Sequence, residues 1–175
     1  MIFWHVGATL AIVRWVFRDP KMDVRFVILG ALLPDLVDKP IGAILFFRTF
    51  RNGRIFAHTL LFSLLLLVAA MLLTRRGTRA RQAWLGVPIG SLLHLVLDGM
   101  WAAPVTFWWP LFGWSFPQVP EAYWTDLIRR VTSDPLLVAE EALGLAYLVY
   151  LWNKAHLTDL ERRRSFFRTG QLEES

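Results

Sequence analysis

The sequence predicts an all-α membrane protein: a polytopic helical bundle of about five transmembrane or half-membrane helices with an aromatic-rich interfacial loop. Its 175 residues are 55% hydrophobic with a mean hydropathy of +0.43, above the roughly 45–50% apolar content of soluble domains. Nine Trp and thirteen Phe accompany the apolar residues. Apolar runs of helical length recur at 2–17, 24–37, 55–73, 82–101 and 135–152.

These runs differ in how well they fit a membrane span. The run 55–73 has 19 residues, which rise about 28 Å as a helix, close to the roughly 30 Å hydrocarbon core. The run 24–37 is shorter and fits a half-helix or a re-entrant piece as well as a span. An extra run at 41–50 is too brief to cross alone. We expect one membrane-embedded domain over 1–153 and a basic cytoplasmic tail over 154–175.

The Lys and Arg residues predict the orientation, since acidic residues contribute little to it. If the N-terminus starts outside and all five runs cross, cytoplasmic Lys and Arg outnumber the outer ones about two to one. We therefore expect a multi-pass protein of the plasma (inner) membrane with its C-terminus in the cytoplasm. The connection 102–134 then lies outside, and its segment "PVTFWWPLFGWSFP" is typical of an interfacial aromatic belt or a lid.

Composition also restricts the partners and cofactors. The chain has no cysteine, which excludes disulfides and thiolate metal sites. A net charge of +5 and a pI of about 10.2 could serve nucleic-acid binding, but Trp among apolar runs favours cationic loops facing anionic lipid headgroups. We expect membrane lipid, and no nucleic acid, as a partner.

Ionisable side chains inside the apolar runs gather at one predicted level, near the outer ends. They are His5, Asp35, Asp38, His58, His94, Asp98, Glu140 and Glu141. A charge at the bilayer centre costs about 2.5–3.5 kcal/mol on insertion scales, so such groups are usually paired, cavity-facing or functional. Imidazoles and carboxylates without thiols suit Zn²⁺, Mn²⁺ or Fe²⁺. We infer a metal centre of one or two ions.

Spacing supports this inference, with alternatives at each position. His94 and Asp98 are four residues apart and share a helix face, as do Arg54 and His58. A single His in an apolar helix is more often a hydrogen-bonded core residue than a ligand. The motif "PDLVD" could be a solvated helix-ending turn, and Arg54 could be an interfacial Arg whose stem lies in lipid.

Of the two adjacent acids in the last run, one is expected to face the centre. We favour Glu140 over Glu141, because Gly144 and Tyr147 continue its face and a glycine there allows close helix approach.

Three motifs resemble a known family. "GALLPDLVDKP" (30–40), "RIFAHTLLFS" (54–63) and "HLVLDGMWAAPVTFWWPLFGW" (94–114) follow an N-terminal His. Over about residues 1–115 the chain resembles the YdjM/DUF457 family of membrane-bound predicted metal-dependent hydrolases. That family is distantly similar to the zinc-dependent phospholipase C and P1 nuclease group, whose all-helical fold binds metals through dispersed His, Asp and Glu.

The resemblance implies a ligand set and roles for its neighbours. The implied ligands are His5, Asp35, His58, His94 and Asp98, with Glu140 as a possible further ligand. Asp38 would support a ligand or act as a base. Zn²⁺ is the first expectation, with Mn²⁺ or Fe²⁺ as alternatives. One or two ions are expected rather than three, because the chain has an Ala-Pro run around Pro104 and Leu136 where the phospholipase group has further His ligands.

The predicted function is a metal-dependent hydrolase that acts on a phosphoester at the outer leaflet, with lipid or another amphiphile as substrate. A bound cation makes a water nucleophilic at neutral pH, Asp38 or Asp35 could accept its proton, and Arg54 could hold a phosphate. The alternative is a non-catalytic scaffold or accessory subunit with a structural metal site. A transporter is disfavoured, because ionisable groups do not continue through the cytoplasmic halves of 55–73 and 82–101.

Overall fold

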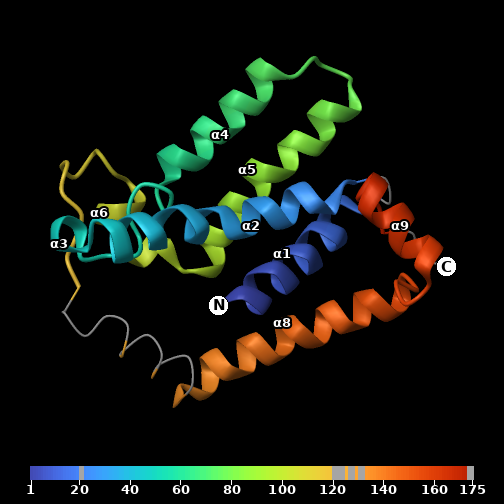
Figure 1. Ribbon diagram of the computed structural model, residues 1–175. Coiled ribbons are helices and arrows are strands. Elements are labelled where there is room, and N and C mark those ends of the chain that lie inside the picture. The colour runs from blue at the N-terminus through green and yellow to red at the C-terminus, as the bar shows by residue number, and fades with distance from the viewer. Residues whose placement is uncertain (20–21, 120–124, 126–128, 130–132, 173–175) are drawn as a thin grey trace.

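The computed structural model describes residues 1–19, 22–119, 125, 129 and 133–172, and within these ranges all regular structure is helical (Figure 1). The longer helices are α1 (Ile2–Phe17), α2 (Val24–Asp38), α4 (Leu60–Leu73), α5 (Arg79–Leu97), α8 (Pro135–Lys154) and α9 (Leu160–Thr169). Short pieces join them: a π-helix (Lys39–Leu45), α3 (Phe47–Phe50), a 3₁₀ turn (Met100–Ala102) and α6 (Pro104–Phe107). The all-α prediction is confirmed.

Membrane-spanning length is clear for one described helix. The 20 residues of α8 are long and apolar enough to cross a bilayer, rising about 30 Å. The helices α1 and α4 are apolar but shorter, with 16 and 14 residues. The sequence predicted about five transmembrane or half-membrane helices; in the described part of the chain one helix is a clear spanning candidate, and a bundle of five spans is not confirmed.

The predicted helix start at residue 55 is wrong. Helix α4 begins at Leu60, after Thr59, whose hydroxyl accepts a hydrogen bond from the Phe62 N–H at 3.0 Å. Residues before Thr59 form an irregular segment because several of their backbone N–H groups donate to the Asp38 side chain instead of entering a helix. An apolar sequence cannot reveal this, since the competing acceptor lies 17 to 20 positions away.

Glycines set the tightest helix contact, between α2 and α5. A Cβ on Gly30 would lie 2.1 Å from the Val87 carbonyl oxygen, and one on Gly90 would lie 2.3 Å from the Val27 carbonyl oxygen. Gly86 meets residues 26 and 27, whereas Gly90 meets residues 27 to 31, so the two helices run in the same direction. This close, parallel contact holds the C-terminal ends of α2 and α5 side by side.

A second glycine contact joins α1 to α8. A Cβ on Gly7 would lie 2.5 Å from the Gly144 carbonyl oxygen, and one on Gly144 would lie 2.3 Å from that of Phe3. Farther along both helices, Ala11 and Tyr147 line a shared pocket. The helices α1 and α8 are therefore parallel, and Figure 1 shows them side by side, running toward the end of the molecule where α9 lies.

Helix α9 packs back on the bundle. The Val24 N–H donates to the Gly170 carbonyl at 2.9 Å, and Leu157 and Leu172, which flank α9, belong to the buried core with Val13 and Val27. Asp159 caps the helix, and the backbone N–H groups of residues 162 and 161 lower the pKa of its exposed carboxyl group. The segment expected to be a tail thus shares the core of the preceding helices.

Candidate metal centre

Three histidines from three separate segments meet at one end of the bundle. His5 lies in the first turns of α1, His58 just before α4 and His94 in the last turn of α5. Their side chains are 2%, 0% and 1% exposed. The His94 ring centroid lies 4.2 Å from that of His5 and 5.1 Å from that of His58. The parallel contact of α2 and α5 brings Asp35 to the same place, and Asp98 caps the C-terminus of α5.

Each imidazole is oriented by an acceptor on Nδ1. His58 Nδ1 lies 2.7 Å from Asp38 Oδ2, His94 Nδ1 lies 2.7 Å from the Ala31 carbonyl oxygen, and His5 Nδ1 lies 2.5 Å from that of Met1. Carbonyl and carboxylate oxygens only accept, so each Nδ1 is a donor, and in neutral His58 and His94 rings the Nε2 atom then presents a lone pair. Metal-binding histidines are held in this way, with one ring nitrogen donating to protein and the other facing the ion.

The Nε2 atoms and two carboxylates surround a common point. His58 Nε2 lies 3.3 Å from His94 Nε2, 3.6 Å from Asp35 Oδ1 and 3.6 Å from Asp98 Oδ2. His94 Nε2 lies 4.0 and 3.9 Å from the same two oxygens. Ligand atoms each about 2.0–2.2 Å from one ion are separated by roughly 3–4 Å. These distances allow His58 and His94, with either carboxylate, to share a single Zn²⁺-sized cation.

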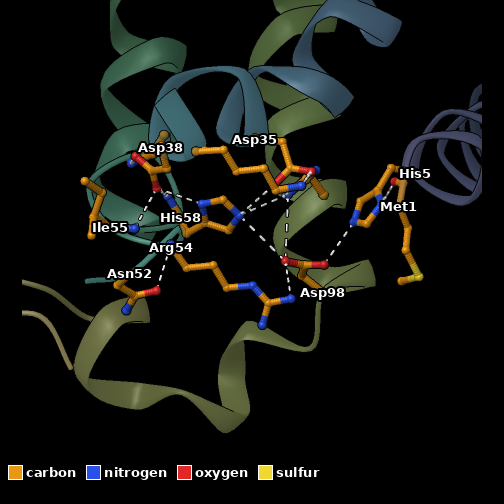
Figure 2. A network of polar contacts seen from close by, with 12 residues as sticks. Met1, His5, Asp35, Asp38, Asn52, Arg54, Ile55, His58 and Asp98 are labelled. Atoms are coloured by element: carbon orange, nitrogen blue, oxygen red, sulfur yellow. Dashed lines mark hydrogen bonds and ion pairs between the residues drawn. The ribbon is translucent and has the colours of Figure 1, made fainter. Parts of the chain in front are cut away.

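His5 contacts the other oxygen of Asp98. Its Nε2 lies 3.1 Å from Asp98 Oδ1, on the opposite side of the carboxylate from the oxygen that faces His58 (Figure 2). Two three-residue groups have ligand atoms within 4.8 Å of one another: His5, His94 and Asp98, and Asp35, His58 and His94. Both groups include His94, so they share one ligating side chain.

Asp38 supports His58 rather than facing the centre. It is 0% exposed, and its oxygens accept from the N–H groups of Ile55, Ala57 and His58 at 2.7, 2.9 and 3.0 Å as well as from the His58 ring. Four hydrogen bonds occupy the acceptor sites of a carboxylate. Of the two roles expected for Asp38, the contacts favour support of a ligand over proton acceptance from water.

Two cationic side chains flank the centre, fewer than the carboxylates that surround it. Arg54 Nη2 lies 2.9 Å from Asp98 Oδ2, and Lys39 Nζ lies 2.5 Å from Asp35 Oδ2. The carboxylates of Asp35, Asp38 and Asp98 exceed these cations by one, so with neutral imidazoles the buried cluster carries a net negative charge. A buried net charge is costly, and a divalent cation among the ligands would offset it.

The Arg54 side chain lies at the open side of the centre. It is 51% exposed, whereas the Asp98 carboxylate that it contacts is 6% exposed. Asn52 fixes the backbone there, accepting from the Arg54 N–H at 2.9 Å and donating to the Pro117 carbonyl at 2.7 Å (Figure 2). The guanidinium is thus placed between the buried ligands and the surroundings.

An aromatic cluster adjoins this opening. Phe56, between Arg54 and His58 in the chain, packs edge-on against Trp109 and Phe116, whose own rings stack at 5.5 Å. Neighbouring apolar side chains are exposed, including Leu111 at 78% and Trp114 at 78%. This exposed aromatic surface is typical of a membrane interface, as expected for the described part of the connection 102–134.

The last acidic pair is placed differently from the expectation. Glu141 Oε2 accepts from the Phe3 N–H at 3.0 Å, and its Oε1 lies 3.9 Å from the Met1 amino group. No contact of Glu140 with the cluster occurs among the described residues. The structure therefore gathers His5, Asp35, His58, His94 and Asp98, places Asp38 and Arg54 against them, and leaves Glu140 outside.

Sequence reasoning missed four supports. Lys39 is four residues after Asp35, a helical spacing that could have identified the ion pair. The carbonyl groups of Met1 and Ala31 carry no such signal, because a backbone acceptor is the same in every residue. Asn52 lies in an irregular segment, and its side-chain contact with the Pro117 carbonyl joins positions 65 residues apart. Their role depends on helix packing that only the folded chain provides.

Comparison with known proteins gives a single result. The model of a family described as YdjM inner membrane protein matches residues 1–157. No curated protein and no solved structure matches the chain. The matched range includes every residue of the cluster and all of α8.

Proposed function

Since the chain belongs to the YdjM family of inner membrane proteins, we propose that it is an integral-membrane, metal-dependent hydrolase that cleaves a phosphoester of a lipid or another amphiphile. The observation that carries the proposal is the convergence of Nε2 lone pairs from His58 and His94 with Asp35 and Asp98, beside the exposed guanidinium of Arg54. A structural metal site needs only its ligands. A phosphoesterase also needs a positively charged side chain that contacts the substrate, and Arg54 is placed to do so.

His58, His94, Asp35 and Asp98 would hold the ion, with His5 on the second oxygen of Asp98. A divalent cation bound there would polarise a phosphoryl oxygen and lower the pKa of a bound water toward 7. Zn²⁺ is the first candidate for this N/O ligand set, and Mn²⁺ or Fe²⁺ are alternatives.

Side chains around the ion would bind the substrate and orient the ligands. Arg54 presents a planar fork of donors suited to two phosphate oxygens and to the negative charge that develops during phosphoryl transfer. Asp35 Oδ1 faces the Nε2 atoms of His58 and His94, and its Oδ2 pairs with Lys39, so Asp35 would act as a ligand and the bound water would lose its proton to solvent. Asp38 keeps the His58 ring in its ligating tautomer.

The surroundings support an amphiphilic substrate. The exposed Trp114 and Leu111 belong to the segment whose Trp109 packs against Phe56, two residues after Arg54 in the chain, so an ester group at headgroup depth could reach the centre sideways from the leaflet. Water-soluble phosphoesters would then be poorer substrates than phospholipids presented in vesicles or detergent.

Turnover tests the proposal. Full-length protein in detergent is assayed with a chromogenic phosphodiester and with a fluorescent phospholipid, before and after chelation and with each metal restored. We expect metal-dependent hydrolysis, preferentially of the lipid, and loss of activity in Asp98→Asn. Asp159→Asn is the matched control, because Asp159 is an exposed helix cap and Asn caps helices equally well. Bound metal without hydrolysis of either substrate would identify a non-catalytic scaffold instead.

A further inference from the structure

A second charged pocket lies away from the metal centre, between the C-terminal halves of α1 and α8. It has a volume of about 650 Å³. Arg14, Arg18 and Lys154 contribute cationic side chains to its lining, and Asp19 contributes a carboxylate. The three cations exceed the one acid by two charges. Neither the proposed hydrolase chemistry nor the family match assigns a role to this pocket.

Its walls are aromatic and apolar. Trp15, Tyr147 and Tyr150 line the pocket with Leu151 and Leu172. Trp15 is 73% exposed and Tyr150 is 53% exposed, so their rings face outward as well as lining the pocket. A cationic floor with amphipathic aromatic walls suits a ligand with a phosphate at one end and apolar groups at the other.

The position of the pocket points to the membrane surface. Lys154 is the last residue of α8, the helix able to cross a bilayer. Arg14 is nine residues beyond His5, which in a helix is about 14 Å farther along α1. Because α1 and α8 are parallel, the pocket lies at the opposite end of this helix pair from the metal centre. Exposed Trp and Tyr at the end of a spanning helix mark the interfacial depth.

A role in helix capping does not account for the arrangement. Cations near helix C-termini offset the helix dipole, and Arg14 and Lys154 lie in such turns. Arg18 is the C-cap residue of α1, and its Nε donates to the Trp15 carbonyl at 3.2 Å. This contact uses one of the five N–H donors of the guanidinium, and a capping role requires neither a concave surface nor aromatic neighbours. The combination favours a bound anion with an apolar portion.

We propose that the pocket lined by Arg14, Arg18 and Lys154 binds the phosphate group of an anionic membrane phospholipid, at the opposite end of the α1–α8 pair from the metal centre. Guanidinium groups bind phosphate oxygens in pairs, and the aromatic walls contact the glycerol and upper acyl chain. Each cation near an anionic leaflet adds attraction. The pocket thereby holds one lipid against the α1–α8 contact.

Native mass spectrometry of full-length protein tests the proposal. The protein in non-ionic detergent is titrated with short-chain phosphatidylglycerol, with phosphatidylcholine of the same chain length, and with inorganic phosphate. We expect one phosphatidylglycerol to bind more tightly than phosphatidylcholine. Arg18→Gln should weaken that binding about tenfold, the usual effect of losing one charge-assisted hydrogen bond.

The matched control is Arg76→Gln, which removes the same charge from the exposed α4–α5 connection, outside the pocket. It should bind phosphatidylglycerol like the wild type. Retained metal by each variant confirms an intact bundle, and Lys154→Gln replaces Arg18→Gln if that variant does not fold. Equal binding of the two lipids, or equal loss in Arg76→Gln, would overturn the proposal. Displacement of the lipid by submillimolar inorganic phosphate would also overturn it, because the pocket would then recognise free phosphate.

Discussion

His58, His94 and His5 differ in sequence context but share one arrangement: a protein oxygen accepts from Nδ1, and Nε2 faces the cluster. The residue types and their helical spacing predict which side chains take part, since His94 and Asp98 must share a face. The ring orientations could not be predicted, because two of the three acceptors are backbone carbonyls placed by helix packing. Glu140 shows the limit of the same reasoning: two adjacent acids present equivalent signals, and a slight preference based on Gly144 selected the one that does not contact the cluster.

Asp38 gives the first prediction at this scale. Asp38→Asn should weaken metal affinity by about 10- to 100-fold, the usual effect of altering the partner of a ligating imidazole, because an amide in place of the carboxylate cannot accept all four hydrogen bonds. Competition with a metal-sensing dye measures the affinity. Asp159→Asn, which removes a carboxylate from the surface, should leave it unchanged. An Asp38→Asn protein with wild-type affinity would refute the supporting role.

Arg54 gives a second prediction about a single residue. Arg54→Gln should retain bound metal but lose about 10²- to 10³-fold in kcat/KM for a phosphoester, the magnitude found for removing one preorganised donor to a developing negative charge. Arg54→Lys should recover only part of the loss, because an ammonium lacks the paired donors of a guanidinium. Activity that survives in Arg54→Gln would reduce Arg54 to an interfacial cation.

At the scale of elements, the apolar runs of the sequence predicted the positions of the long helices well, but they did not predict the irregular segment before α4. The helices α1, α2 and α8 end within two residues of the apolar runs 2–17, 24–37 and 135–152. Residues 55–59 are as apolar as a helix, yet Asp38 takes their N–H groups. The start of α4 therefore depends on a carboxylate that is distant in the sequence. The irregular segment that results points the His58 ring toward the metal centre.

The glycine contact of α2 with α5 yields an element-scale prediction. Gly30→Ala and Gly90→Ala should lower stability by at least about 1–3 kcal/mol, the usual cost of overpacking, because the new Cβ would meet backbone atoms at 2.1 and 2.3 Å. Gly86→Ala is the matched comparison in the same interface, where the nearest atoms are at 3.1 Å, and it should cost less. Thermal unfolding midpoints in detergent measure how much each variant is destabilised. A larger loss of stability in Gly86→Ala than in the other two variants would contradict the close parallel packing.

On the scale of the whole molecule, four of the described long helices form two parallel pairs. Helices α1 and α8 run one way, α2 and α5 run in parallel with each other, and His94 near the end of α5 meets His5 near the start of α1. Successive crossings of a bilayer would produce this alternation. Among the described helices, α8 alone is both long and apolar enough to span a bilayer.

Orientation can be tested with single cysteines, because the natural chain has none. Leu111→Cys, at an exposed position in the segment whose Trp109 packs against Phe56, should react with a membrane-impermeant maleimide in intact spheroplasts. Arg164→Cys, exposed on α9, should react only after permeabilisation. Labelling in the opposite pattern would place the metal centre on the cytoplasmic side and reverse the topology predicted from Lys and Arg.

Metal analysis tests the shared coordination most directly. Full-length protein purified in detergent without added chelator is measured for transition metals, as wild type and as His58→Ala, Asp98→Asn and Asp159→Asn. We predict at least one divalent ion per chain in the wild type and in Asp159→Asn, and its loss from the other two variants while their helical content is kept. Wild-type protein that contains no metal and takes up no added Zn²⁺, Mn²⁺ or Fe²⁺, or cluster variants that retain the full amount, would contradict a centre built from His58, His94, Asp35 and Asp98.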